Sequence, residues 1–181
     1  SSVATPVEVG SIGTPGVAQG VFVAGGLAYV ADGSSGLRVI DISSPAAAVE
    51  VGVLDTPGVA QGVSADGGFV YLADDLFGLR VIDVSIPAAP VEVASLDTPG
   101  EAQGVSVVGG FAYVADGFAG LRVVLTVAAV PTEIGSIDTP DFAQGVSLGG
   151  GFAYVADGPS GLRVIDVSDP TSPVEVGSVD T

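Results

Sequence analysis

Four arginines, no lysine and 21 acidic residues give this chain of 181 residues a formal net charge of −17. Such a surface repels phosphate backbones and anionic lipid headgroups, which argues against nucleic acids and membrane surfaces as partners. The lack of Cys, His and Lys excludes disulfides, thiolate or imidazole metal sites, Ser-His-Asp and Cys-His centres, and Schiff-base lysines.

The first part of the chain predicts four short strands joined by turns. The strands are expected over Gln19–Ala24, Leu27–Ala31, Leu37–Ile42 and Val49–Leu54, where β-branched and aromatic residues are frequent. A glycine pair, a loop of Asp, Gly and Ser, and a Ser-Ser-Pro turn separate them. Connections this short require antiparallel hairpins, so we expect the four strands to form a meander.

The same pattern returns along the whole chain. The segment GLAYVADGSSGLRV at 26–39 recurs with few changes at 68–81, 110–123 and 151–164. Four strands per period of 41 or 42 residues are typical of a β-propeller blade. The sequence therefore predicts an all-β fold, a single β-propeller domain (1–181) of four four-stranded antiparallel blades. The expected repeat units are 7–48, 49–90, 91–131 and 132–173, followed by an extra outer strand in 174–181.

The distribution of apolar residues favours a propeller over a solenoid. The first three strands of each repeat are almost continuously apolar, so both faces of each sheet must be covered, and the next repeat around a ring covers them. The fourth strand alternates, as an outer strand in contact with water does. A glutamate recurs at one matched position of this strand, at Glu8, Glu50, Glu92, Glu133 and Glu175.

Two recurring elements resemble a known family. GLRVID followed by S-x-P occurs at 36–41, 78–83 and 161–166, and YVAD or YLAD occurs at 29–32, 71–74, 113–116 and 154–157. In these elements the chain resembles the LVIVD repeat of bacterial and archaeal cell-surface proteins. The resemblance implies a β-propeller fold and a location at the cell surface or outside the cell. It implies no common catalytic or ligand-binding residue.

The third repeat departs from the others. It is one residue shorter, and Leu125 stands where the other repeats have an aspartate. The apolar run that continues to Val130 makes sense if another surface covers it. We therefore expect a contact patch formed by Val124, Leu125, Val127 and Val130.

The only basic residues recur at one position of the third strand. They are Arg38, Arg80, Arg122 and Arg163. A buried guanidinium needs a carboxylate or carbonyl partner, so we expect these side chains to hold one blade to the next. A ring of arginines that binds an anionic ligand is the alternative.

Three further sets of polar residues recur once per repeat. Asp32, Asp74, Asp116 and Asp157 follow the second strand, where they stabilise a turn or, alternatively, bind Ca²⁺ as the only candidate cofactor. Gln19, Gln61, Gln103 and Gln144 begin the innermost strand and are expected to ring the axis. Tyr29, Tyr71, Tyr113 and Tyr154 lie between apolar neighbours and are expected in the core.

The predicted function is structural rather than enzymatic. Nearly every carboxylate belongs to a repeated position, whereas a glycosidase needs one pair in opposed environments. We expect an extracellular or cell-surface scaffold that associates with itself. The alternative is a binding module for a glycan or Ca²⁺ with one weak site per blade. An extracellular protein or a glycan is a candidate partner. The charge fits either a halophilic source or a secreted acidic protein.

The sequence contains five segments with the outer-strand pattern, one more than four blades need. Either Val7–Ile12 pairs with Leu162–Val167 and closes the ring, or Val174–Val179 completes the fourth blade and leaves Val7–Ile12 loose. An unpaired strand can add to the sheet edge of another chain. We therefore expect the terminal strands to join chains into a two-chain ring or an open assembly, with a self-closed four-bladed monomer as the alternative.

Overall fold

The computed structural model describes residues 5–127 and 130–180, and in them the chain forms four sheets of four antiparallel strands. We number the sheets as blades 1 to 4. No helix in these residues is long and apolar enough to cross a membrane. Blade 1 contains β1 (Gly20–Ala24), β2 (Leu27–Ala31), β3 (Leu37–Asp41) and β4 (Val49–Leu54); blade 2 contains β5 (Gly62–Asp66), β6 (Phe69–Ala73), β7 (Leu79–Asp83) and β8 (Val91–Leu96); blade 3 contains β9 (Gly104–Val108), β10 (Phe111–Ala115), β11 (Leu121–Leu125) and β12 (Thr132–Ile137); blade 4 contains β13 (Gly145–Gly149), β14 (Phe152–Ala156), β15 (Leu162–Asp166) and β16 (Val174–Val179).

Each blade is a meander whose strands pair in sequence order. The turn between the first two strands is a glycine pair; in blade 1, Gly25 and Gly26 have φ values of 59° and 81°, which side chains disfavour. Two single-turn 3₁₀ helices, Pro45–Ala47 and Gly158–Ser160, lie in connections. The expected antiparallel meander and its repeat are confirmed.

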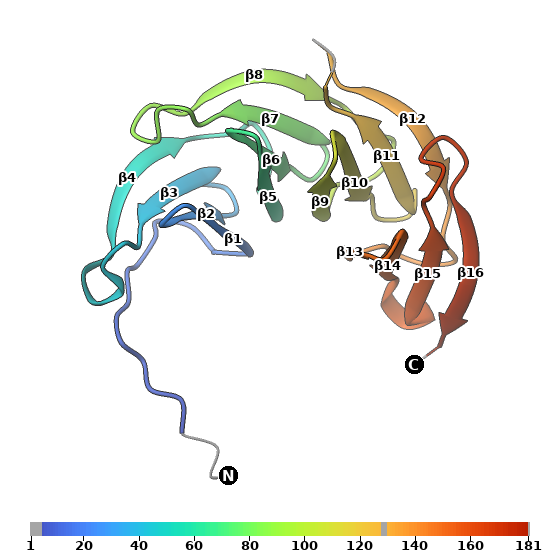
Figure 1. Ribbon diagram of the computed structural model, residues 1–181, viewed down its shortest axis with the longest axis horizontal. Helices are drawn as coiled ribbons and strands as arrows, with labels where there is room; N and C mark the ends of the chain where they lie inside the picture. Colours follow the sequence, from blue (N-terminus) through green and yellow to red (C-terminus); the bar gives the residue numbers. More distant parts are fainter. Residues whose placement is uncertain (1–4, 128–129, 181) are drawn as a thin grey trace.

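The four blades follow one another along an arc (Figure 1). The inner strands β1, β5, β9 and β13 lie toward the centre, and the outer strands β4, β8, β12 and β16 lie on the periphery. Consecutive inner strands pack together, and no comparable contact joins β13 to β1 within the described residues. The fold is therefore propeller-like but open, with blade 1 at one end of the arc and blade 4 at the other (Figure 1).

Among the described residues, three hydrophobic clusters lie one at each boundary between blades, which we call a junction, and a fourth, formed by Ala28, Val30 and Ile40, lies within blade 1. At the first junction Leu37 and Val39 of blade 1 belong to one cluster with Val70, Leu72 and Ile82 of blade 2. All of these aliphatic side chains are completely buried, so each contributes about 1.5–3 kcal/mol relative to an exposed position. Packing between blades, rather than within one sheet, therefore holds the arc together.

The structure corrects the expected repeat boundaries. β16 pairs with β15 and completes blade 4, so 174–181 is not an extra element. Val7–Ile12, the other candidate, belongs to no strand and is exposed. Each blade begins with its inner strand, so the units 7–48, 49–90, 91–131 and 132–173 each begin one outer strand too early.

The shorter third repeat forms a complete blade. β11 pairs with β12, with the same register shift seen at the outer strands of the other blades. Val124 is fully buried at the second junction, whereas Val127 and Val130 are exposed and Leu125 is half-buried. The expected patch is therefore not one surface, because Val124 belongs to the core; 128–129 lie outside the described residues.

Candidate functional site: aspartate clasps, grooves and end faces

A buried aspartate after the second strand of every blade binds the linker that precedes the blade. In blade 1 the Thr14 hydroxyl donates to Asp32 Oδ1 at 2.6 Å, and the Gly16 amide donates to Oδ2 at 2.8 Å. We call this arrangement the aspartate clasp. The threonine–aspartate pairs are Thr14–Asp32, Thr56–Asp74, Thr98–Asp116 and Thr139–Asp157, and all four aspartates are fully buried.

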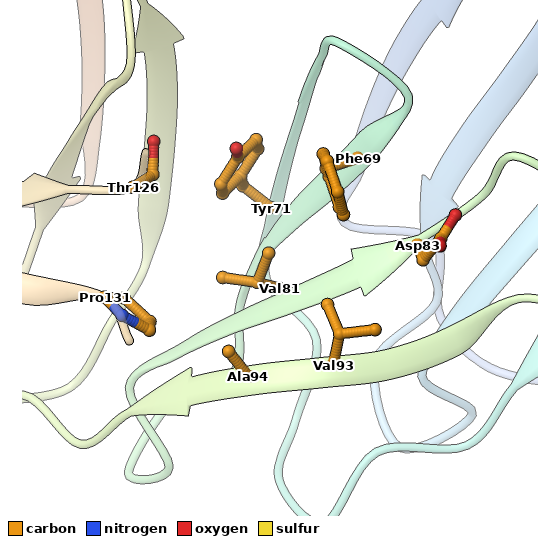
Figure 2. A pocket seen from close by; sticks show the side chains of 8 residues that line it. All are labelled: Phe69, Tyr71, Val81, Asp83, Val93, Ala94, Thr126 and Pro131. Carbon is orange, nitrogen blue, oxygen red and sulfur yellow. The ribbon is translucent and has the colours of Figure 1, made fainter. Parts of the chain in front are cut away.

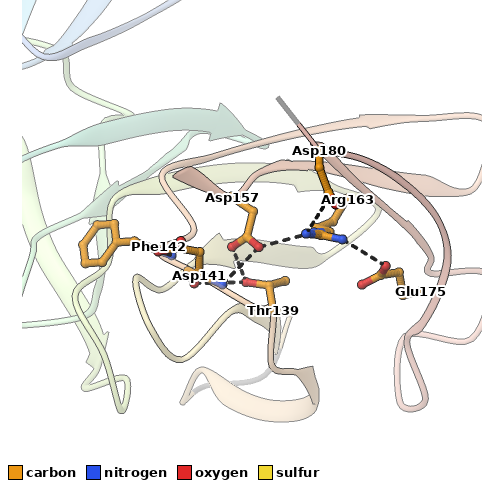
Figure 3. Close-up of polar contacts among 7 residues, drawn as sticks. All are labelled: Thr139, Asp141, Phe142, Asp157, Arg163, Glu175 and Asp180. Atoms are coloured by element: carbon orange, nitrogen blue, oxygen red, sulfur yellow. Dashed lines mark hydrogen bonds and ion pairs between the residues drawn. The ribbon is translucent and has the colours of Figure 1, made fainter. Parts of the chain in front are cut away.

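The arginine of the third strand faces the same aspartate. Figure 3 shows blade 4, where Arg163 Nε lies 3.4 Å from Asp157 Oδ2. Its other nitrogens lie 3.6 Å from Glu175 and 3.0 Å from Asp180, on and just after β16. The guanidinium thus joins the middle of its blade to the outer strand.

The arginines link blades only indirectly. The direct ion pairs of Arg38, Arg80, Arg122 and Arg163 lie within their own repeat. The expected link between blades passes instead through the aspartate, which accepts from the linker that comes from the preceding blade. Because each guanidinium is nearly buried and faces two or three carboxylates, an anionic ligand would have to displace them.

Burial raises the pKa of Asp74 and Asp116 above the usual value of 3.8. Hydrogen bonds from the clasp threonine and from the backbone amide, together with the nearby arginine, oppose this rise. A buried carboxylate is costly unless it is paired, and each clasp provides these partners. The clasp is therefore a structural element that fixes the linker between blades.

The same hydrogen bonds bear on the calcium alternative. In each clasp one aspartate oxygen accepts from the threonine and the other accepts from a backbone amide. Among residues 5–127 and 130–180, no group of three or more acidic side chains is arranged around a common metal position. A Ca²⁺ ion, which takes six to eight oxygen ligands, would have to displace the clasp partners.

The glutamines and tyrosines show how the ends of the arc differ from its middle. Each glutamine precedes an inner strand, and its backbone N–H donates to the alanine that ends the second strand of the same blade, as in Gln19 to Ala31 at 2.8 Å. The side chains of Gln61 and Gln103 are half-buried, and those of Gln19 and Gln144 are exposed. Tyr29, Tyr71 and Tyr113 are buried at junctions, whereas Tyr154 is exposed on blade 4.

Apolar surface is left uncovered at both ends of the arc, although Ala28, Val30 and Ile40 of blade 1 are buried. The blade 4 end face, defined by Tyr154, Ala156, Leu162 and Val164, corresponds to surfaces that are covered in blades 1 to 3. Leu162 is 38% exposed, while its equivalents Leu37, Leu79 and Leu121 are 0% exposed. The blade 1 end face, defined by Ala18, Val21 and Val23, shows the same contrast: Val21 is 64% exposed, and its equivalents Val63 and Val105 are 8% exposed.

A groove lies at each junction, and glycine-pair turns line those of the first and third junctions. Figure 2 shows the groove of about 330 Å³ between blades 2 and 3, which is lined by Phe69, Tyr71 and Asp83 of blade 2 and by Thr126 and Pro131 of blade 3. Grooves of about 230 and 280 Å³ occupy the first and third junctions. Each groove includes the tyrosine of the preceding blade, Tyr29, Tyr71 or Tyr113.

Comparison with known families agrees with this architecture. The model of the LVIVD repeat matches residues 15–56, 57–98, 99–139 and 142–181, which is nearly the whole chain. The chain belongs to the LVIVD repeat family. The matched repeats of this LVIVD protein begin at the linker before each inner strand, in agreement with the blade boundaries.

A solved structure shows the same fold. The crystal structure of the computationally designed Ika4 protein superposes with a TM-score of 0.70 at 8% identity, covering 88% of the LVIVD chain and 98% of Ika4. At this identity the likeness concerns the fold alone. No curated protein matches the chain.

The clasp threonines were not among the residues selected from the sequence. A Thr-Pro pair precedes each inner strand, at 14–15, 56–57, 98–99 and 139–140. The recurrence of this Thr-Pro pair in every repeat was the sequence signal that could have identified the threonines. The contact with aspartate spans 18 residues, so spacing along the chain does not reveal it.

Proposed function

We propose that this LVIVD protein is a non-enzymatic scaffold or assembly module, outside the cell or at its surface, that associates with itself through its terminal blades. The observation that carries the proposal is the pair of uncovered apolar end faces. Leu162 and Tyr154 at one end and Val21 at the other are exposed, although their equivalents at the internal junctions are buried or, for Val146, half-buried. Contiguous apolar surface of this kind is typical of an interaction site.

A structural role agrees with how the polar groups are used. The buried aspartates and arginines, which would be the first candidates for chemistry, hold the linkers and the outer strands. The four copies are near-equivalent, whereas acid–base catalysis requires groups whose environments set them apart.

Two properties support an extracellular or cell-surface location. The net charge of −17 keeps a protein dispersed at high salt, and the recurring GLRVID and YVAD elements resemble those of cell-surface proteins. Labelling of intact and permeabilised source cells with an antibody to the protein tests this location. Equal labelling of intact and permeabilised cells means that the protein is exposed outside the cell. Labelling that is seen only after permeabilisation contradicts the proposed location.

The self-association is tested by a charge on either end face. Val21→Asp and Leu162→Asp should each shift the native mass toward that of one chain, because an unpaired carboxylate buried in an apolar contact is costly. The matched control is Ile86→Asp, which replaces an exposed side chain in the β7–β8 connection. Native masses that are the same for all three variants and the unmodified chain contradict the proposal.

The repeated grooves favour a second candidate function, a binding module for glycans with one weak site per junction. Each groove presents a tyrosine and a phenylalanine, Phe69 in the first and second and Phe152 in the third, and the second groove adds Asp83 (Figure 2). Aromatic faces beside a few polar groups suit a sugar ring. Titration with a panel of oligosaccharides, with and without Ca²⁺, supports this candidate if several equivalent sites are filled and removes it if no heat or spectral change is seen.

A further inference from the structure

We propose that the blade 4 end face of one chain packs against the blade 1 end face of a second copy, in the arrangement of the three internal junctions, and that two copies close an eight-bladed ring. The proposal rests on the self-association proposed above and specifies its surface and its partner. Its basis is the repeat itself, because the structure contains three examples of what covers such a face.

The apolar groups of the two end faces match those that meet at internal junctions. At the third junction, Tyr113 and Leu121 of blade 3 share a buried cluster with Ala143 and Val146 of blade 4. The equivalents of the first two are Tyr154 and Leu162 at the end of blade 4, and those of the last two are Ala18 and Val21 at the start of blade 1. A second copy therefore brings the same side-chain types together.

A pair of backbone hydrogen bonds is repeated at each internal junction. Each end of the arc carries the residue that corresponds to one of the two partners. The Gly33 amide donates to the Ala60 carbonyl at 3.1 Å, and the Ala60 amide donates to the Gly33 carbonyl at 2.9 Å. The same bridge joins Asp75 to Ala102 and Gly117 to Ala143. The next members of the two series are Gly158 and Ala18, and in the described residues neither has such a bridge. Pairing them between copies satisfies these backbone groups.

The number of blades limits the assembly to two chains. The two end faces differ, so their contact is head-to-tail, and such contacts form either a closed ring or an open filament. Propellers typically contain four to eight blades. Two copies of this four-bladed arc give eight blades, whereas three copies would exceed the range. A two-chain ring contains the junction twice and leaves no end face exposed.

The N-terminal segment must move when the ring closes. Residues 7–12 (VEVGSI) differ from β16 (VEVGSV) in one side chain. The backbone of Gly10 runs so close to the Pro45 carbonyl that no Cβ fits between them. Two outer strands make the same close contact, Gly52 of β4 with Pro87 and Gly135 of β12 with Pro170. Residues 7–12 thus lie where the outer strand of a preceding blade lies.

β16 should hold this position in the ring. Arg163 binds both Glu175 and Asp180 of the β16 segment, while the N-terminal segment has Gly13 at the position that corresponds to Asp180. β16 is also part of the same chain as β15, so its pairing has no cost of association. We therefore infer that residues 7–12 of the second copy are displaced.

Engineered disulfides test the junction, because the chain has no cysteine of its own. A hydrogen-bonded antiparallel pair has Cα atoms about 5.5 Å apart, within the range of about 4.4–6.8 Å that a disulfide spans. Ala18→Cys with Gly158→Cys is the test pair. Asp75→Cys with Ala102→Cys is the matched control at an internal junction, and Asp75 shows that this positive-φ position accepts a side chain.

After oxidation, the masses are read under denaturing conditions. The ring predicts a covalent dimer with two disulfides for the test pair and a single chain with one internal disulfide for the control. As a second reading, chains carrying only Ala18→Cys and chains carrying only Gly158→Cys should become joined by a disulfide between positions 18 and 158 when they are mixed; neither should form this bond alone.

Every other outcome overturns the ring. An internal disulfide in the test pair means that one chain closes on itself, and a ladder of masses means an open filament. If neither the test pair nor the mixture is cross-linked, the native mass of the reduced protein separates the two proposals. A mass above one chain means that association uses another surface, so that only the ring fails; a single-chain mass contradicts the self-association as well.

Discussion

Removal of one clasp hydroxyl should destabilise the whole arc. In blade 3 the Thr98 hydroxyl donates to Asp116 Oδ1 at 2.5 Å, and Asp116 is completely buried. In Thr98→Val the carboxylate keeps the Gly100 amide at 2.9 Å and the Arg122 Nε at 3.8 Å. A hydrogen bond to a charged group is worth about 1.5–3 kcal/mol, so we expect a loss of about 2 kcal/mol in the free energy of unfolding.

Thermal unfolding followed by circular dichroism measures this loss. For a chain of this size, about 2 kcal/mol corresponds to a decrease of about 4–8 °C in Tm. Thr98→Ser keeps the hydroxyl and should retain most of the stability. Thr132→Val, at an exposed position of β12, should change the free energy of unfolding by less than about 0.5 kcal/mol. If Thr98→Val unfolds at the same temperature as Thr132→Val, or if Thr98→Ser is as unstable as Thr98→Val, the clasp does not stabilise the fold.

Three further predictions concern salt, pH and the N-terminus. Tm should rise between low and molar NaCl, because screening reduces the self-repulsion of a net charge of −17; a flat or falling Tm contradicts this. Because the pKa values of Asp74 and Asp116 are raised in the folded state, the two groups contribute their whole stabilisation below pH 3.8. This stabilisation is lost as the pH rises through their folded-state pKa values. Hydrogen bonds from Ser85 lower the pKa of Asp83, whose contribution is present above pH 3.8 and is lost only below it. Tm should therefore hold or rise from pH 7 toward pH 4, and less so in Asp74→Asn; a steady fall over this range, or an unchanged profile in Asp74→Asn, is the contrary result. Deletion of residues 1–12 should lower the dissociation constant of the dimer in sedimentation experiments, whereas weaker association would mean that this segment supports the contact.

The sequence determined much of the fold because the information lies in a repeat. Strand positions follow from turn residues at fixed spacing, and in blade 1 the observed strands match the expected ones or differ by one residue, as β3 does by ending at Asp41. The two outer-strand candidates could not be separated, because VEVGSI and VEVGSV have the same pattern. In the structure β16 pairs with β15, and Arg163 contacts Asp180 just after it, a contact that depends on tertiary geometry.

The site was less predictable than the fold. The arginines and aspartates were identified as a recurring set, but the partner of each aspartate is a threonine in the linker, 18 residues before it. The difference between Tyr154 and the other tyrosines was also hidden, because a sequence repeat assigns the same surroundings to every copy. Which copies lie at the ends of the arc, and are therefore exposed, depends on whether the ring closes.

The mass of the unmodified chain in solution tests the central claim most directly. Native mass spectrometry over a dilution series, at an ionic strength that screens the acidic surface, resolves the species present. The open arc with two complementary end faces predicts a discrete species of about 35 kDa, twice the 17.5 kDa of one chain, that dissociates to single chains on dilution. A mass of 17.5 kDa at every concentration, or a continuous series of larger masses, would contradict it.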